Sequence, residues 1–245
     1  VIKRTLHMAT EAKFREDPDL AFLQYSDFQD LKLLSNTLIA DSEGTEQWTG
    51  GLKSTLVKNM SMYSTEDDLY KNSWKAIAAE IQLFGGDTVV NLVRGKGVVY
   101  RELLEDVAKK TGVDFHKDTS DISLLEEKVL RTLFGRITQL NELDFINKKL
   151  KEKGYLGLTS IKESPLKTIK NSLGGGTASG TAGGLLAGLN MAKNFIKVNP
   201  FVAAATLPLT AKDITAPAYR VTIPAACIVA MMRIKHEENK IVPKI

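Results

Sequence analysis

The sequence has few of the residues from which covalent cross-links and metal sites are built. It holds one cysteine, Cys227, and three histidines, His7, His116 and His236, among 245 residues. A single cysteine excludes an intrachain disulfide, which fits a reducing, cytoplasmic environment. No two histidines have i, i+4 spacing, so neighbouring ligands cannot form a zinc site of the usual Cys/His type. We therefore expect no metal and no cofactor.

Familiar catalytic motifs are missing as well. No Gly-x-Ser-x-Gly elbow occurs, and no lysine lies between Asn171 and Ala192, where a phosphate loop would need one. Gly95-Lys96-Gly97 could bind an anion at a helix start, but such a pair of glycines more often makes a structural turn. These absences lead us to predict a protein that is not an enzyme.

Charge is distributed unevenly along the chain. From Phe145 onward there are 15 Lys/Arg and 5 Asp/Glu, whereas the preceding part has 18 and 24. A basic part of this kind can meet an anionic membrane surface, nucleic acid or the acidic part of its own chain. A solvated lysine-rich surface is the alternative.

Helix signals recur along the first two thirds of the chain, and strand signals are weak. Asp17-Pro18 pairs an N-cap with a proline at a first helical position, and Ser64 with Asp67 resembles a capping box. Apolar residues then recur at helical spacing up to the stop signal Gly85-Gly86. We predict a helix over Asn72–Leu83 with Trp74, Ile77 and Ile81 buried. Further helices are predicted at about 28–38, 87–93, 98–110, 121–137 and 142–153.

The composition changes in the last third of the chain. No charged residue occurs between Asn171 and Ala192, and few follow before Met232. We predict an all-α fold, a compact multi-helix bundle with a glycine-rich apolar C-terminal part. Residues 1–7 read as a vector leader, 8–154 as a helical region, 155–172 as a connecting segment and 173–245 as the glycine-rich region. The last region either packs with 8–154 as one domain or stands apart.

Four glycines in this last region have a regular four-residue spacing: Gly176, Gly180, Gly184 and Gly188. On a helix they would share one face and let another backbone approach closely, a device frequent between membrane helices. Each glycine costs a helix in water about 1 kcal/mol relative to alanine, so close packing would have to compensate. A packed helix in water, a flexible loop and a membrane-active helix all remain open.

Two arginines lie beside apolar residues: Arg94, and Arg220, the lone charge of its apolar neighbourhood close to Pro224. An unpaired buried charge is prohibitive, so we expect at least one of them to be buried and bonded to a carboxylate or to backbone carbonyls. Pro224 is expected to kink a helix or to lie in its first turn.

Several short motifs occur in a recognisable order along the chain: Asp19-Leu20-Ala21-Phe22-Leu23, Trp74, Leu83-Phe84-Gly85-Gly86-Asp87, Leu92-Val93-Arg94-Gly95, Tyr100 and Ala218-Tyr219-Arg220-Val221-Thr222-Ile223-Pro224. Together they resemble the bacterial YaaW-type family of uncharacterised proteins. The resemblance implies a central region grouped with ubiquinol–cytochrome c chaperones, although the later tryptophan-bearing block of the mitochondrial chaperones is missing. Within these motifs, Arg94, Tyr100, Tyr219 and Arg220 are the candidate interaction residues.

These observations favour a non-enzymatic protein that binds an unidentified protein partner, in a chaperone-like role in the cytoplasm. The alternative is a membrane-associating protein that inserts its Asn171–Met232 part. A nucleic-acid binder comes third, because the basic part has two arginines and no known motif.

Overall fold

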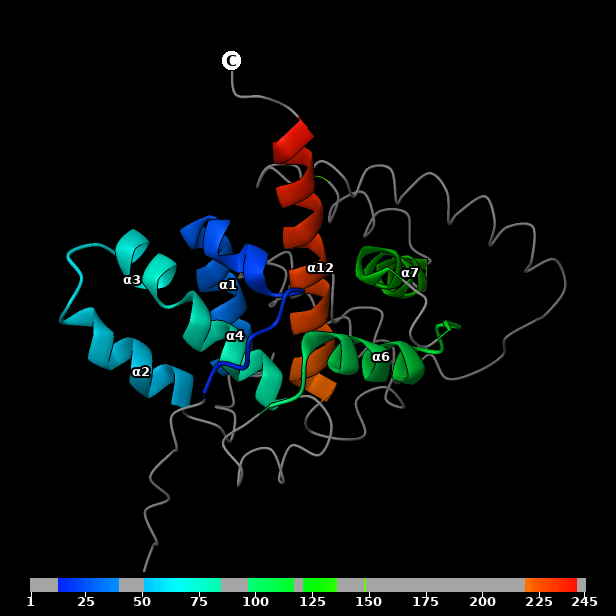
Figure 1. Cartoon of the computed structure of the whole chain (residues 1–245), viewed down its shortest axis with the longest axis horizontal. Helices are drawn as coiled ribbons and strands as arrows, with labels where there is room; N and C mark the ends of the chain where they lie inside the picture. The colour runs from blue at the N-terminus through cyan, green and yellow to red at the C-terminus, as the bar shows by residue number, and fades with distance from the viewer. Residues whose placement is uncertain are drawn as a thin grey trace, which may run out of the picture. The chain divides into compact units, whose positions relative to one another are not determined.

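The computed structural model describes residues 13–39, 51–84, 97–116, 121–135, 148 and 219–241 (Figure 1). These ranges contain helices and turns and no β-strand, so the predicted all-α fold is confirmed. The chain divides into two compact units, Val1–Leu103 and Leu104–Ile245, and the division falls inside a helix. The predicted connecting segment 155–172 lies outside the described residues, as does 173–218, so the predicted domain boundary stays a prediction.

The first unit is built from one 3-10 helix and four α-helices that lie together in Figure 1: η1 (Ala21–Tyr25), α1 (Phe28–Ile39), α2 (Gly51–Met60), α3 (Glu66–Asn72) and α4 (Trp74–Leu83). Helix α1 packs against α2, α3 and α4, and η1 packs against α3 and α4. The apolar positions that recur at helical spacing supply the core. Its fully buried side chains include Leu20, Leu23, Leu31, Leu34, Leu38, Ile77 and Ile81.

The helix predicted over Asn72–Leu83 exists, but it is interrupted at Ser73. The backbone N–H of Ser73 donates to the carbonyls of both Leu69 and Tyr70, which ends α3 and lets α4 begin at Trp74. Ile77 and Ile81 are buried as predicted. Trp74 was predicted to be a core residue, but it is only half-buried. It is the first residue of α4.

Trp74 packs on the surface of the first unit. Its ring meets that of Phe14 edge to face, with the ring centroids 5.4 Å apart. The Nζ of Lys75 lies 5.6 Å from the Trp74 ring centre, at cation–π distance. The cap of the preceding helix is displaced by one residue from the predicted pair. It is the Oγ1 of Thr65 that accepts from the backbone N–H of Asp68.

Helix α6 (Tyr100–Thr111) spans the division between the units and matches the predicted helix at 98–110. Its buried positions include Leu103 and Val107, as the spacing indicates. Gly112 follows with a φ of 75°, the left-handed conformation that ends many helices. Gly112 therefore ends α6.

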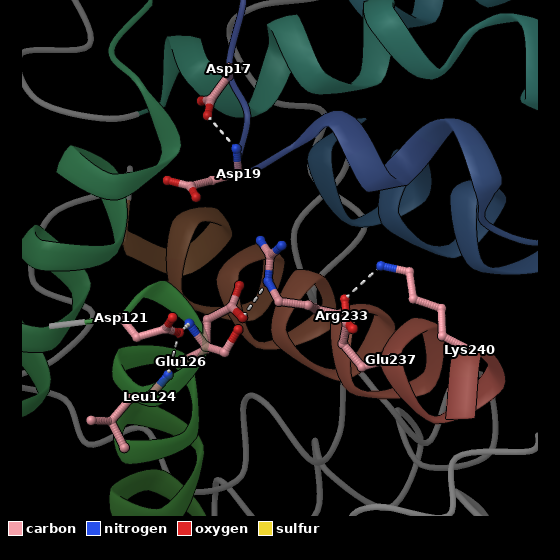
Figure 2. A network of polar contacts seen from close by, with 9 residues as sticks. Asp17, Asp19, Asp121, Leu124, Glu126, Arg233, Glu237 and Lys240 are labelled. Carbon is pink, nitrogen blue, oxygen red and sulfur yellow. Dashed lines mark hydrogen bonds and ion pairs between the residues drawn. The ribbon is translucent and has the colours of Figure 1, made fainter. Parts of the chain in front are cut away.

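The second unit also contains α7 (Ile122–Gly135) and α12 (Tyr219–Ile241), which pack against each other. Asp121 caps α7, since its Oδ1 accepts from the backbone N–H groups of Ser123 and Leu124 (Figure 2). In α12, all residues from Val221 to Met232 are buried, which is about three turns of helix. A helix buried on every side is typical of a core helix. The chain remains helical through Pro224, which lies beyond the first turn of α12.

Gly97 shows why the Gly95-Lys96-Gly97 motif ends in glycine. The backbone N–H of Val98 donates to the carbonyl of Gln82 at 3.0 Å. A Cβ placed on Gly97 would collide with the backbone carbonyl carbon and oxygen of Gln82 and lie 2.5 Å from its Cβ. The glycine thus lets two backbones touch, which is the structural use of the motif. Gly95 and Lys96 lie outside the described residues.

We expect Gly97→Ala to lower the free energy of unfolding by about 1–3 kcal/mol, because backbone atoms must shift to admit the methyl group. Urea denaturation followed by circular dichroism measures the change. Gly112→Asn is the matched control, since no atom lies within 4 Å of that Cβ position and asparagine tolerates a positive φ. A Gly97→Ala protein as stable as the parent would contradict this close contact.

Candidate functional site

The predicted site residues are only partly within the described chain. Those outside it are Gly85, Gly86, Arg94, Gly176, Gly180, Gly184 and Gly188. Arg220 belongs to α12, but the position of its side chain is not described. The expected pairing of Arg94 or Arg220 and the close-packed glycine face therefore stay predictions.

The two tyrosines among the candidate interaction residues have different surroundings. The side chain of Tyr100 is fully buried, so it belongs to the core instead of a contact surface. Tyr219 is half-buried, and the Nζ of Lys110 lies 5.1 Å from the centre of its ring. This is a cation–π contact between the first residue of α12 and the last turn of α6.

A buried polar cluster in the first unit joins three segments that are distant in sequence. One Asp17 oxygen accepts from the backbone N–H of Tyr100 at 2.6 Å and from the Gln82 amide at 3.2 Å. The same Gln82 side chain donates to the carbonyl of Arg15 and accepts from its backbone N–H, both at 2.9 Å. Asp17 and Gln82 are almost completely buried. The cluster fixes the segment before η1 against the end of α4 and the start of α6.

Asp17 corrects a prediction, because it does not cap an α-helix that starts at Pro18. A turn follows it, closed by the Leu20 N–H on the Asp17 carbonyl, and then the 3-10 helix η1. Its carboxylate instead caps α6, where the backbone N–H groups of a helix start favour a negative charge. Asp17 thus caps a helix as its residue type indicates, but the helix is α6 and not one that starts at Pro18.

The second unit contains a buried ion pair between α7 and α12 (Figure 2). The Nε of Arg233 lies 2.7 Å from Oε2 of Glu126, and the two side chains are 10% and 2% exposed. Arg233 comes directly after the buried run Val221–Met232 of α12. Of the two arginines in this helix, Arg220 was predicted to be notable and Arg233 was not, since nothing local in the sequence connects Arg233 with Glu126, 107 positions earlier.

Exposed apolar side chains gather at the end of α2, a helix that the sequence analysis did not predict. Val57, Met60 and Met62 are each more than 60% exposed. We call these three residues the α2 patch. Two other apolar residues of the helix, Leu52 and Leu56, are buried in the core.

The turn after α2 is held in place by two hydrogen bonds. The backbone N–H of Met62 donates to the carbonyl of Asn59 at 2.8 Å. The Ser61 hydroxyl donates to the carbonyl of Lys58 at 3.0 Å. Val57 and Met60 are three residues apart and therefore neighbours on the surface of α2. The α2 patch is thus presented by an ordered helix end and the turn that follows it.

Neither buried polar cluster offers an arrangement typical of catalysis. Their groups cap a helix, fix a segment or pair two helices, which are structural uses. Within the described ranges there is no group of His, Cys, Asp and Glu that could hold a metal ion. Cys227 is buried in α12, and burial raises the pKa of its thiol to about 12. In the same part of the chain, no helix combines the length and apolar character needed to cross a membrane.

The chain has relatives over nearly its whole length. It is 29% identical to a UPF0174 protein of Helicobacter pylori strain J99, with 92% of this chain and 94% of the relative covered. It is 28% identical to the UPF0174 protein YaaW of Escherichia coli K12, over 90% and 95% of the two chains. No protein-family model and no solved structure matches it. The motifs from Asp19 to Pro224 thus indicated the correct relatives, which are proteins of the bacterial UPF0174, or YaaW-type, family.

Proposed function

We propose that this chain is a non-enzymatic helical protein that binds other proteins through the α2 patch. The observation that carries the proposal is the exposure of three apolar side chains at the end of α2 and in the turn after it, 62% for Val57, 62% for Met60 and 63% for Met62. Scattered exposed apolar residues are ordinary, but neighbouring ones on an ordered surface are typical of interaction sites.

Methionine suits a surface that accepts more than one partner. Its side chain is unbranched, and its polarizable thioether can adapt to irregular apolar shapes. Covering one side chain of this size contributes about 1.5–3 kcal/mol, part of which is lost in ordering the partner. Three such side chains support weak and adaptable binding, as expected of a chaperone-like factor that holds unfolded segments briefly.

A test compares two variants with the same change in net charge. Val57→Asp/Met60→Asp adds two negative charges and removes two apolar side chains of the patch. Lys58→Asp also lowers the net charge by two, on the same helix, but leaves the α2 patch intact. Both changes are made at exposed positions, so both proteins are expected to keep the parent's melting temperature.

The measurement is light scattering by a heat-aggregating model protein mixed with the purified chain. We expect the parent and Lys58→Asp to suppress the scattering, and Val57→Asp/Met60→Asp to lose most of that effect. Equal suppression by both variants would contradict a role for the α2 patch. Flotation with anionic vesicles tests the membrane alternative, and vesicle binding lost only in the double variant would assign the patch to a lipid surface.

A further inference from the structure

We propose that Met60 and Met62 form a reversible oxidation site, through which peroxide weakens binding at the α2 patch. The inference rests on the proposed function, whose regulation it describes. The supporting observation is the difference in solvent exposure between the methionines of α2 and its following turn and those of α12. Met60 and Met62 are 62% and 63% exposed, whereas Met231 and Met232 of α12 are 1% and 2% exposed.

This difference in exposure separates the methionines by reactivity. Oxidation of a thioether requires the oxidant to reach the sulfur atom. The side chains of Met60 and Met62 are open to solvent, and those of Met231 and Met232 lie inside the buried run of α12. A water-borne peroxide should therefore modify the first pair long before the second.

The reaction is a two-electron oxygen transfer. A lone pair of the methionine sulfur attacks one oxygen of hydrogen peroxide, the S–O bond forms, and the O–O bond breaks. The departing hydroxide takes up the remaining peroxide proton and leaves as water, so sulfur is oxidised and peroxide is reduced. Methionine sulfoxide reductases reverse the change with thiols as the reductant.

The product changes the character of the surface that carries it. A sulfoxide is polar and accepts hydrogen bonds, so burying it against an apolar partner has a desolvation cost that the thioether lacks. Two of the three residues of the α2 patch would change at once, leaving Val57 as its apolar part. The fold should remain intact, because neither side chain belongs to the core.

The cysteine thiol, the most reactive sulfur group in many proteins, does not compete with the methionines for peroxide here. Cysteine reacts with peroxide as the thiolate, and Cys227 is fully enclosed in α12 with its pKa raised by burial. Mild peroxide treatment should thus act on the exposed methionines and leave the only cysteine of the chain reduced.

The experiment treats the full-length chain with hydrogen peroxide and follows each methionine by peptide mass spectrometry. We expect Met60 and Met62 to be oxidised at least about tenfold faster than Met231 and Met232, as their solvent exposure dictates. Binding of an apolar fluorescent dye and suppression of client aggregation should both fall after oxidation. Methionine sulfoxide reductases A and B with dithiothreitol should restore both.

Met60→Leu/Met62→Leu is the matched control, because leucine keeps the patch apolar but cannot be oxidised. It should bind dye and client like the parent and be unaffected by peroxide. Equal oxidation rates at Met60, Met62, Met231 and Met232, or dye and client binding that survives full oxidation, would overturn the proposal. Absence of client binding before any peroxide is added would instead contradict the proposed function, and the dye and mass-spectrometric readouts would still decide the oxidation site.

Discussion

Replacing Glu126 by alanine is expected to lower the free energy of unfolding by about 3–5 kcal/mol. The Glu126 side chain is 2% exposed and lies 2.7 Å from the guanidinium of Arg233, which is itself almost buried. Removing the carboxylate leaves the arginine charge in a desolvated site without the negative charge of Glu126 beside it. Since domains are commonly stable by about 5–15 kcal/mol, the loss would be a large part of the total.

Glu127→Ala provides the matched control for this substitution. Glu127 is the next residue of α7, but its side chain is 39% exposed, and its partner Arg131 is on the same helix. Exposed pairs of this kind contribute about 0.3–0.5 kcal/mol. Urea denaturation of the two variants should thus differ by several kcal/mol. Similar midpoints for both would show that the Glu126–Arg233 pair does not hold α7 to α12.

Ile77→Ala should destabilise the first unit by about 2–5 kcal/mol. Ile77 is completely buried, and its helix α4 packs against η1, α1, α2 and α3. The surrounding side chains come from several elements and can only partly fill the space left by the removed methyl and methylene groups. The loss therefore combines the apolar transfer free energy with the cost of a cavity.

Ile77→Val gives the graded comparison, because it removes one methylene and should cost about 0.5–1.5 kcal/mol. Thermal and urea unfolding followed by circular dichroism would measure both variants. If Ile77→Ala were no more harmful than Ile77→Val, the site would have collapsed around the smaller side chain, and the core would be less tightly packed than the burial of α4 indicates.

Local patterns were sufficient to predict the helices that have strong periodicity and clear ends. The apolar spacing in α6 and α7 is a property of short stretches, and both helices occur close to the predicted ranges 98–110 and 121–137. The break at Ser73 escaped prediction because the apolar period continues across it. Thr65 replaced Ser64 as the cap because neighbouring hydroxyls are equivalent in a sequence pattern.

The site features depend on contacts that a local pattern does not contain. Asp17 with Tyr100 and Glu126 with Arg233 pair residues that only the tertiary fold brings together. The α2 patch was missed for a different reason. Helix α2 was not among the predicted helices, and only the tertiary packing leaves Val57 and Met60 exposed while Leu52 and Leu56 are buried.

The Asp17 cap has a consequence for the order in which the first unit assembles. The start of α6 receives its capping carboxylate from a residue 83 positions earlier. Contacts of such long sequence separation must overcome the entropy of closing a large loop, so they tend to form late. While the chain leaves the ribosome, helices α1 to α4 are already available before Tyr100 emerges. The segment around Asp17 would then dock last, as the step that completes a core formed by nearer neighbours.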